Sequence, residues 1–219
     1  MGRDLDIAKP AFYQDILCEL YERLRYGKSD PRIISVTEIT QCLLYSYFHR
    51  HRNVCVPQIG SLVIGTAGHR MVMDILSEKG LIVERFVYAK RDNIKLIGRV
   101  DVYDPNTNTV IEIKFLRKIP PEPYKDHVLQ TAIYKEMINA DRALLVYIQT
   151  DDLSNVKIWR IKRKHNILDY AFERAKTLSE SLVHSTPPKP EKGRWCRYCP
   201  YAFDCASLWK KLRKTMWKD

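Results

Sequence analysis

The sequence predicts an α/β protein in which a central mixed sheet is flanked by helices. Residues 98–103 and 110–114 alternate apolar and polar side chains on either side of a polar Asp-Pro-Asn-Thr-Asn-Thr turn, which is typical of a β-hairpin. After a proline-rich run, residues 125–139 are a predicted helix that leads into an apolar strand at 142–150. A connection from a strand through a helix to another strand is the crossover that parallel pairing requires.

The N-terminal part of the chain predicts two helices. Residues 11–26 carry apolar side chains at helical spacing, and Gly27–Pro31 ends that helix. Ser35 followed by Glu38 resembles a capping box, which is expected to open a second helix. This second helix is expected to carry Ile39, Cys42, Leu43 and Tyr47.

The next stretch predicts a loop over residues 60–68 that enters a helix over 66–79, with Gly80 as its C-terminal cap. His69 falls in the first turn of that helix. A lone histidine at such a position is more often a surface or core residue than a metal ligand. The remaining predicted elements are strands at 81–90 and 156–161 and a long helix at 165–184.

The hairpin places two carboxylates and a lysine on one face. If the turn is centred on Pro105–Thr107, Asp101 lies opposite Glu112, and Lys114 follows Glu112 on the same face. Two carboxylates on directly opposite residues of paired strands lie close enough to repel each other unless a cation neutralises them. The hairpin therefore suggests a divalent metal site, although the same pattern occurs on solvated strand surfaces.

The helix at 125–139 places Gln130 and Tyr134 on one face, because they are four residues apart. On spacing alone, the simpler interpretation is a polar helix flank.

Composition restricts the class of protein and of partner. The chain has 219 residues and a net charge of +11, which favours a polyanionic partner such as nucleic acid. It has no apolar run of the roughly 20 residues that a membrane span requires, so no membrane association is expected. The N-terminus lacks the apolar region of a signal peptide, so cytoplasmic localisation is expected.

Three of the six cysteines form a metal-binding pattern. Cys196, Cys199 and Cys205 have C-x2-C-x5-C spacing, which can close around a metal centre without a regular element between them. A fourth ligand is needed, and the candidates are Cys42, Cys18, Cys55 or a histidine. Spacing alone does not separate zinc from a [2Fe–2S] or [4Fe–4S] cluster.

The motifs together resemble a known family. Gly65-x-x-x-His69, Gly98-x-x-Asp101, Glu112-x-Lys114 and Gln130-x-x-x-Tyr134 occur in the order found in RecB-like nucleases of the PD-(D/E)XK superfamily. A distant cysteine followed by C-x2-C-x5-C resembles the iron–sulfur version of that fold. The whole set, over about residues 35–205, resembles the CRISPR-associated exonuclease family, the fourth of the Cas proteins. Leu43 and Leu44 after Cys42 depart from the proline and basic residue that are frequent in that family.

The resemblance implies a site and its ligands. His69, Asp101, Glu112 and the main-chain carbonyl of Ile113 would hold Mg²⁺ or Mn²⁺, with the histidine favouring Mn²⁺. Lys114 would orient the attacking water or stabilise the transition state, and Gln130 and Tyr134 would position the DNA strand. The four cluster ligands, with [4Fe–4S] favoured and [2Fe–2S] as the alternative, would be Cys42, Cys196, Cys199 and Cys205.

The same resemblance implies a function. The family trims single-stranded DNA ends, commonly from the 5′ side, during CRISPR adaptation, with the integrase proteins as expected partners. Two alternatives stay open at this point. One is a RecB-like nuclease of DNA repair, recombination or a virus, and the other is a non-catalytic iron–sulfur or zinc module that binds nucleic acid.

A single RecB-like nuclease domain over residues 1–219 is the expected organisation. Within it, residues 35–60 would supply one cluster cysteine, 61–184 would form the nuclease core, and 185–219 would carry the remaining cysteines and a basic tail.

Overall fold

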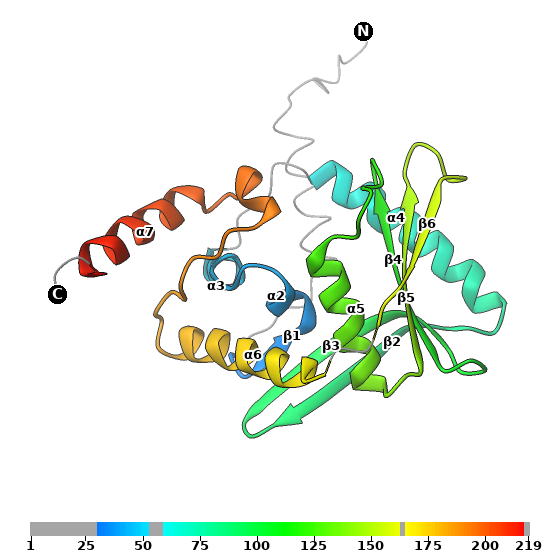
Figure 1. Ribbon diagram of the computed structural model, residues 1–219, viewed down its shortest axis with the longest axis horizontal. Helices are drawn as coiled ribbons and strands as arrows, with labels where there is room; N and C mark the ends of the chain where they lie inside the picture. The colour runs from blue at the N-terminus through cyan, green and yellow to red at the C-terminus, as the bar shows by residue number, and fades with distance from the viewer. Residues whose placement is uncertain (1–29, 53–58, 163–164, 217–219) are drawn as a thin grey trace, which may run out of the picture.

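The computed structural model describes residues 30–52, 59–162 and 165–216, and its elements are arranged around one six-stranded sheet (Figure 1). The strands are β1 (Ile33–Ser35), β2 (Ile82–Arg91), β3 (Ile94–Asp104), β4 (Thr109–Leu116), β5 (Arg142–Gln149) and β6 (Val156–Arg160). The helices are α2 (Val36–Thr40), α3 (Leu43–Arg52), α4 (Ile59–Glu78), α5 (Lys125–Ile138), α6 (Ile167–Val183) and α7 (Ala202–Met216), with a short 3₁₀ helix, η1 (Arg194–Tyr198). The predicted helix at 11–26, together with Cys18 and Cys55, lies outside the described residues.

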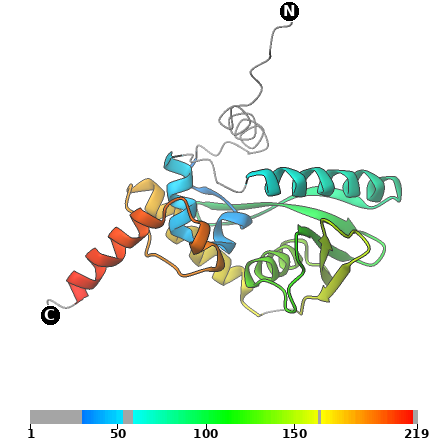
Figure 2. The same cartoon turned by 90° about the horizontal axis from the view of Figure 1, so that it is seen from above.

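The sheet is mixed, as the sequence predicts. Its strand order is β1-β3-β4-β5-β6, and β2 pairs with β3. β3 and β4 are antiparallel, whereas β4 and β5 are parallel along the whole of β4, so α5 is the predicted crossover. α4 lies on one side of the sheet and α5 and α6 lie on the other (Figure 2).

Apolar clusters pack against both sides of the sheet. One cluster holds Leu96 and Val100 of β3 together with Tyr134 of α5 and residues of α6. The other lies under α4 and contains Met73, Val102 and Ile113. The sheet is therefore buried on both faces over the strands that carry the two carboxylates, as expected for a sheet with helices on both sides.

Local signals at several helix ends are confirmed. The Ser35 hydroxyl accepts a hydrogen bond from the Glu38 amide at 3.3 Å, and the Glu38 carboxylate accepts one from the Ser35 amide at 2.8 Å. This reciprocal pair is the predicted capping box. Gly80 has φ +80°, and Asn139 ends α5 with φ 57°, so both have the left-handed conformation that ends helices.

The helix predicted from Ser35 onward is wrong in its extent, because the structure divides it into α2 and α3. Gln41 is extended, with φ −103° and ψ −174°, and ends α2. The Arg174 guanidinium donates to the carbonyls of Ile39 at 2.6 Å and Gln41 at 2.8 Å. A partner from α6 thus satisfies the carbonyls that a continuous helix would have used itself. Cys42 consequently lies at the junction of two helices rather than inside one.

The predicted loop over residues 60–68 is also wrong, because α4 begins at Ile59. Glycine usually indicates a break in a helix, but here Gly68 has a packing role. A Cβ at Gly68 would lie 3.2 Å from the Phe115 ring of β4, so glycine allows α4 to approach the sheet closely. His69 therefore lies well inside the helix instead of in its first turn.

No helix in the described part of the chain is both long and apolar enough to span a membrane.

Candidate nuclease site

The predicted register of the hairpin is confirmed. Val102 pairs with Ile111, Tyr103 with Val110 and Asp104 with Thr109, so the next residues along the two strands are Asp101 and Glu112. The backbone ladder stops there, and the Asp101 carboxylate accepts a hydrogen bond from the Ile113 amide at 2.8 Å. The side chain of Asp101 thus replaces a main-chain bond and is held against β4.

The pairing on the other side of Asp101 is interrupted as well. The β2–β3 ladder passes from the Val83–Val102 pair to the Arg85–Val100 pair, and Glu84 between them has φ 48°. A positive φ is unusual for glutamate, and such local irregularities in strands concentrate near functional sites. Asp101 is thereby placed where the sheet is interrupted on both sides.

Glu112 is the most deeply buried of the predicted site residues, with none of its surface exposed. Its Oε1 lies 2.5 Å from the Lys114 ammonium, and its Oε2 is buried without a hydrogen-bond partner among the described residues. Burial and the negative charge of Asp101 raise the pKa of Glu112 to about 8, against the opposing effect of Lys114. An unpaired buried carboxylate oxygen costs free energy, so this position favours a bound cation.

Lys114 is held in its charged form. Burial alone would lower the pKa of Lys114, but the carboxylates of Glu112 and Asp101 raise it above the ordinary value for lysine. Lys114 is therefore a fixed positive charge beside the two carboxylates. The prediction that Asp101, Glu112 and Lys114 lie together is confirmed.

His69 reaches the site from α4. Its Nε2 lies 3.1 Å from Asp101 Oδ1. Burial lowers the pKa of His69, but the hydrogen bond to Asp101 and the charge of that carboxylate outweigh this effect and raise it. Burial likewise raises the pKa of Asp101, and Lys114 together with His69 more than offsets the effect and lowers it.

Gln130 and Tyr134 approach from the opposite side of the sheet. The Gln130 amide donates to the Tyr134 hydroxyl at 3.3 Å, and both side chains are buried. A Cβ at Gly98 would lie 2.3 Å from a ring carbon of Tyr134, so β3 needs glycine at this point for α5 to pack there. Burial and the charge of Glu112 raise the pKa of Tyr134, which keeps its hydroxyl protonated near the carboxylates.

The N-terminal and C-terminal segments meet at the cysteines. Tyr201 is buried between rings of α3, at centroid distances of 5.4 Å to Phe48 and 5.6 Å to Tyr45. Burial raises the pKa of Cys199, and the nearby thiols of Cys42, Cys196 and Cys205 raise it further. All four predicted cluster cysteines are therefore within electrostatic reach of one another.

An ion pair holds this junction together. Both oxygens of Glu191 accept from the Arg174 guanidinium, at 2.6 and 2.9 Å, and one of them also accepts from the Leu43 amide at the start of α3, at 3.2 Å. The Cys196 sulfur lies 3.8 Å from the Glu191 carbonyl, a contact that fits a weak S–H donor. Glu191 thus connects the helix that follows Cys42 to the segment that carries the other three cysteines.

Comparison with known proteins shows the family to which the chain belongs. The family model for the PD-(D/E)XK nuclease superfamily matches residues 35–206. The chain belongs to this superfamily. It is also similar to the CRISPR-associated exonuclease Cas4 of Saccharolobus solfataricus, with 25% identity over 199 residues, which cover 85% of this chain and 93% of that protein.

Solved structures agree on the fold. The crystal structure of SSO0001 matches with a TM-score of 0.69 and 22% identity, covering 89% of this chain and 95% of that one. A candidate exonuclease from Eubacterium rectale matches with a TM-score of 0.56 and 11% identity, covering 85% and 91%. At these identities the likeness shows the PD-(D/E)XK fold alone.

The acidic site suits the metals that this superfamily uses. PD-(D/E)XK nucleases depend on divalent cations such as Mg²⁺ and Mn²⁺. The buried, unpartnered Glu112 Oε2 beside Asp101 supplies the hard oxygen ligands that these cations prefer. The cysteine donor set equally suits an iron–sulfur cluster. Within residues 30–52, 59–162 and 165–216, no three His, Cys, Asp or Glu side chains lie close enough together to form a metal-binding group.

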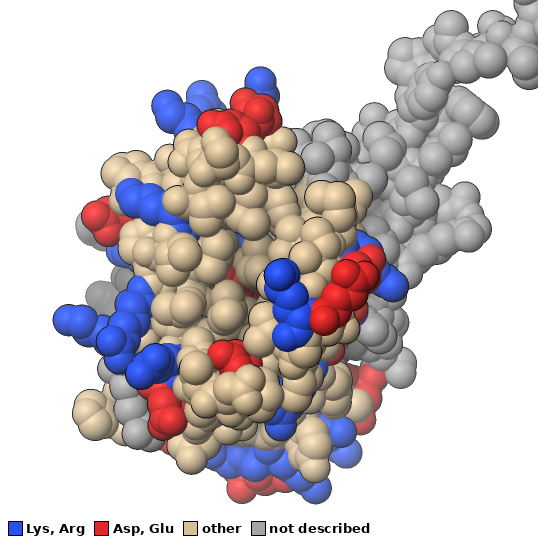
Figure 3. Space-filling model, turned by 90° about the vertical axis from the view of Figure 1, so that its right-hand side faces the viewer, with Lys and Arg blue, Asp and Glu red and all other residues tan. Residues whose placement is uncertain are grey.

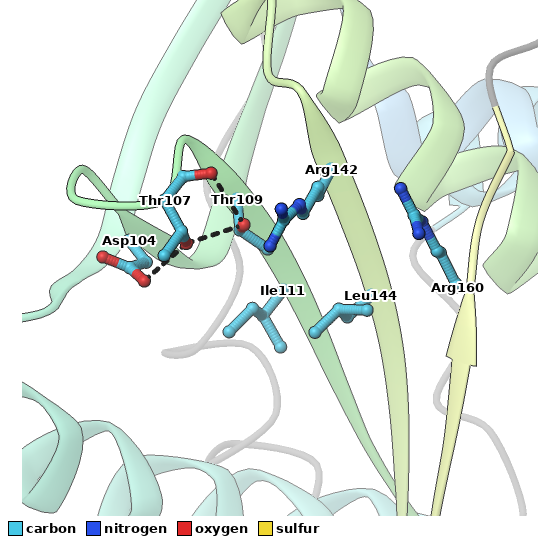
Figure 4. Close-up of a pocket in the computed structure, with 7 residues that line it drawn as sticks. All are labelled: Asp104, Thr107, Thr109, Ile111, Arg142, Leu144 and Arg160. Atoms are coloured by element: carbon cyan, nitrogen blue, oxygen red, sulfur yellow. Dashed lines mark hydrogen bonds between the residues drawn. The ribbon is translucent and has the colours of Figure 1, made fainter.

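A pocket elsewhere in the nuclease fold is separate from the predicted site. A cavity of about 320 Å³ lies at the N-terminal ends of β4 and β5. It is bordered by Arg142, Arg160 and the hairpin turn (Figure 4). The Asp104 carboxylate there accepts a hydrogen bond from the Thr107 hydroxyl at 2.6 Å, so it already has a partner within the turn.

Lysine and arginine side chains lie along the left and lower margins of the face in Figure 3, in keeping with the net charge of +11.

Two residues near the site were not predicted from the sequence. His127 lies one turn before Gln130 on α5, and its Nδ1 is 2.8 Å from the Tyr147 hydroxyl. The Arg194 guanidinium lies 2.9 Å from His127 Nε2 and 2.8 Å from the Asp126 carboxylate, and it stacks on Tyr124 at 3.5 Å. Arg194 thereby joins the cysteine segment to the start of the helix that carries Gln130 and Tyr134. The sequence did contain a signal for His127, because it lies three residues before Gln130 on the predicted helix and therefore on the same helical face.

Proposed function

We propose that this nuclease is a metal-dependent DNA exonuclease, with single-stranded ends as its preferred substrate and 5′ to 3′ polarity. The observation that carries the proposal is the buried Glu112 Oε2, which has no hydrogen-bond partner among the described residues although it lies beside Asp101 and a charged lysine. A structural ion pair would satisfy both carboxylate oxygens, whereas a catalytic site keeps one for a cation.

We assign the roles of the site residues as follows. His69, Asp101, Glu112 and the Ile113 carbonyl would hold Mg²⁺ or Mn²⁺, which supplies Lewis acidity at the scissile phosphate and a bound water of lowered pKa. Lys114, fixed by Glu112 at 2.5 Å, supplies a positive charge for the negative charge that develops on the phosphate.

Gln130 and Tyr134 act as positioning residues. Their mutual hydrogen bond and the contact of Tyr134 with β3 at Gly98 fix the helix behind the site. The raised pKa of Tyr134 keeps its hydroxyl a donor, so it favours contacts to anionic groups.

The biological role that we propose is the trimming of spacer precursors in CRISPR adaptation, in contact with the integrase proteins. The similarity to the Cas4 exonuclease of Saccharolobus solfataricus supports it. We further propose that Cys42, Cys196, Cys199 and Cys205 hold an iron–sulfur cluster, [4Fe–4S] rather than [2Fe–2S]. The meeting of α3 with the C-terminal segment at Tyr201 and Glu191 supports a structural role for that cluster.

The test uses DNA labelled at the 5′ or the 3′ end, single- or double-stranded, with Mn²⁺ or Mg²⁺. The parent protein is expected to release short labelled products from 5′-labelled single strands, and Glu112→Gln and Lys114→Ala are expected to be inactive. An inert parent with both metals, or variants that cut as well as the parent, would overturn the proposal. The visible absorbance of anaerobically purified protein tests the cluster, since a colourless zinc-loaded preparation contradicts it.

A further inference from the structure

β2 exposes two aromatic side chains on the side of the sheet where α4 lies. Phe86 and Tyr88 are 60% and 62% exposed, while Val87 between them is buried in the cluster formed with α5 and α6. Successive side chains of a strand point to opposite faces, so Phe86 and Tyr88 point away from that cluster. Figure 2 shows that the opposite side of the sheet is the side of α4.

The same face leads to the nuclease site. Phe86 pairs with Arg99 of β3 and Tyr88 pairs with Ile97, so each ring lies beside the side chain of its partner. Asp101 follows Arg99 by two residues, a rise of about 7 Å along the strand. The His69 ring of α4 lies 3.1 Å from the Asp101 carboxylate, so Asp101 contacts the side of the sheet on which α4 lies.

Cationic side chains accompany the two rings. The Lys95 ammonium lies 4.8 Å from the centroid of the Tyr88 ring, and Lys90, which pairs with Lys95, is exposed. Arg99 is about half exposed and contacts Glu84 at 3.4 Å. Rings that alternate with lysine and arginine are the surface that binds single-stranded nucleic acid, because bases stack on the rings while the cations contact the phosphates.

We propose that Phe86, Tyr88, Lys95 and Arg99 form a track that binds single-stranded DNA and directs it to Asp101. We name this set the β2–β3 track. Stacking makes its binding tolerant of base sequence, as trimming an arbitrary DNA end requires. The delivery of the strand to a cutting site rests on the proposed function, whereas the binding of the strand by the track does not.

The test separates binding from cutting. Fluorescence anisotropy without divalent metal measures the affinity of labelled oligothymidylate of about 12 nucleotides, a length within the usual site sizes for single strands. Phe86→Ala/Tyr88→Ala is expected to bind at least about fivefold more weakly per ring, with an unchanged slope against salt concentration. Phe86→Trp/Tyr88→Phe keeps both rings and is expected to bind like the parent. The matched control is Phe203→Ala, which removes an 85% exposed ring from α7.

Cutting is measured in parallel on two substrates. The p-nitrophenyl ester of thymidine monophosphate is too small to reach the rings, so the double alanine variant is expected to hydrolyse it at the parent rate. On the long oligonucleotide, the same variant is expected to show a higher KM with a nearly unchanged kcat.

Each remaining outcome decides one of the two proposals. If the parent cuts the oligonucleotide and the double alanine variant binds it equally well, the track is wrong. If the alanines leave binding unchanged but convert a dimer to a monomer in sedimentation, the surface is an interface between copies, and the track is again wrong. If no DNA is cut but binding depends on the rings, the track stands and the proposed nuclease activity fails.

Discussion

Two regions contain a buried or partly buried ion pair: the carboxylate site, and the cysteine junction, where α3 meets the segment that carries Cys196, Cys199 and Cys205. The two pairs differ in how many of their carboxylate oxygens have hydrogen-bond partners. At the junction, Arg174 donates to both oxygens of Glu191 and to two main-chain carbonyls, and the Leu43 amide adds another bond to Glu191. At the site, Lys114 reaches one oxygen of Glu112, and the other oxygen has no partner among the described residues. The pair at the junction thus joins α3, α6 and the segment that carries Cys196, Cys199 and Cys205, whereas the pair at the site leaves an oxygen to which we assign a metal ion in the proposed function.

The largest expected effect is on activity at the incomplete pair. Glu112→Gln should lower the rate of DNA cleavage by about 10³-fold, because it removes a charged ligand and frees Lys114. The same variant should raise the melting temperature of the metal-free protein, since a neutral amide is not repelled by the Asp101 carboxylate. Calorimetry without metal and cleavage assays with Mn²⁺ measure the two effects. A variant that is inactive and also less stable would contradict the comparison.

The complete pair should respond in stability instead. Arg174→Met is expected to destabilise the protein by about 3 kcal/mol, because it leaves Glu191 and two main-chain carbonyls without their donor. Lys176→Met is the matched control, since Lys176 forms an exposed pair with Glu180 on the same helix, where a change below about 0.5 kcal/mol is expected. Urea unfolding measures both, and equal midpoints for the two variants would refute the assignment.

A smaller effect is expected where Tyr134 passes over β3. Gly98→Ala should cost about 2 kcal/mol, because its Cβ would clash with the Tyr134 ring at 2.3 Å. Gly65→Ala is the control, as no atom lies within 4 Å of a Cβ there, and it should stabilise α4 slightly. Tyr134→Ala also destabilises the protein by itself, because it empties a buried site. The loss in the Gly98→Ala/Tyr134→Ala double variant should therefore be smaller than the sum of the two single losses in thermal unfolding. If the two losses simply add, the contact is not the cause.

A separate effect, on stability as a function of pH, is expected at His127. The Arg194 guanidinium can only donate hydrogen bonds, so His127 Nε2 must be the acceptor in their contact. The proton of the neutral imidazole therefore lies on Nδ1, which faces the Tyr147 hydroxyl. Burial, with the charge of Lys114, lowers the pKa of His127 to about 3. The unfolded chain takes up this proton near pH 6.5, so the contribution of His127 to stability is lost as the pH falls from about 6.5 towards 3. His127→Asn cannot titrate, and its free energy of unfolding should therefore fall less steeply than that of the parent over this range.

The two regions also differ in how far the sequence predicts them. Alternation in residues 98–114 predicted the two strands of the hairpin, and the assumed turn at Pro105–Thr107 predicted their register, which the Val102–Ile111 pairing confirms. The order of the motifs was sufficient for the superfamily. The helix boundaries at Cys42 and Ile59 were predicted wrongly, because Arg174 and Phe115, which decide them, lie far away in the sequence.

The sequence by itself therefore determined the strands, the crossover helix and the residue types of the site, since these follow from local periodicity and from the chemistry of single side chains. The tertiary structure alone decided that Glu112 keeps an oxygen without a hydrogen-bond partner among the described residues, that Glu191 joins α3 to the cysteine segment, and that Arg194 contacts α5. Such features depend on which groups share a buried space. Burial sets the cost of an unpaired charge, and no local pattern in the chain encodes it.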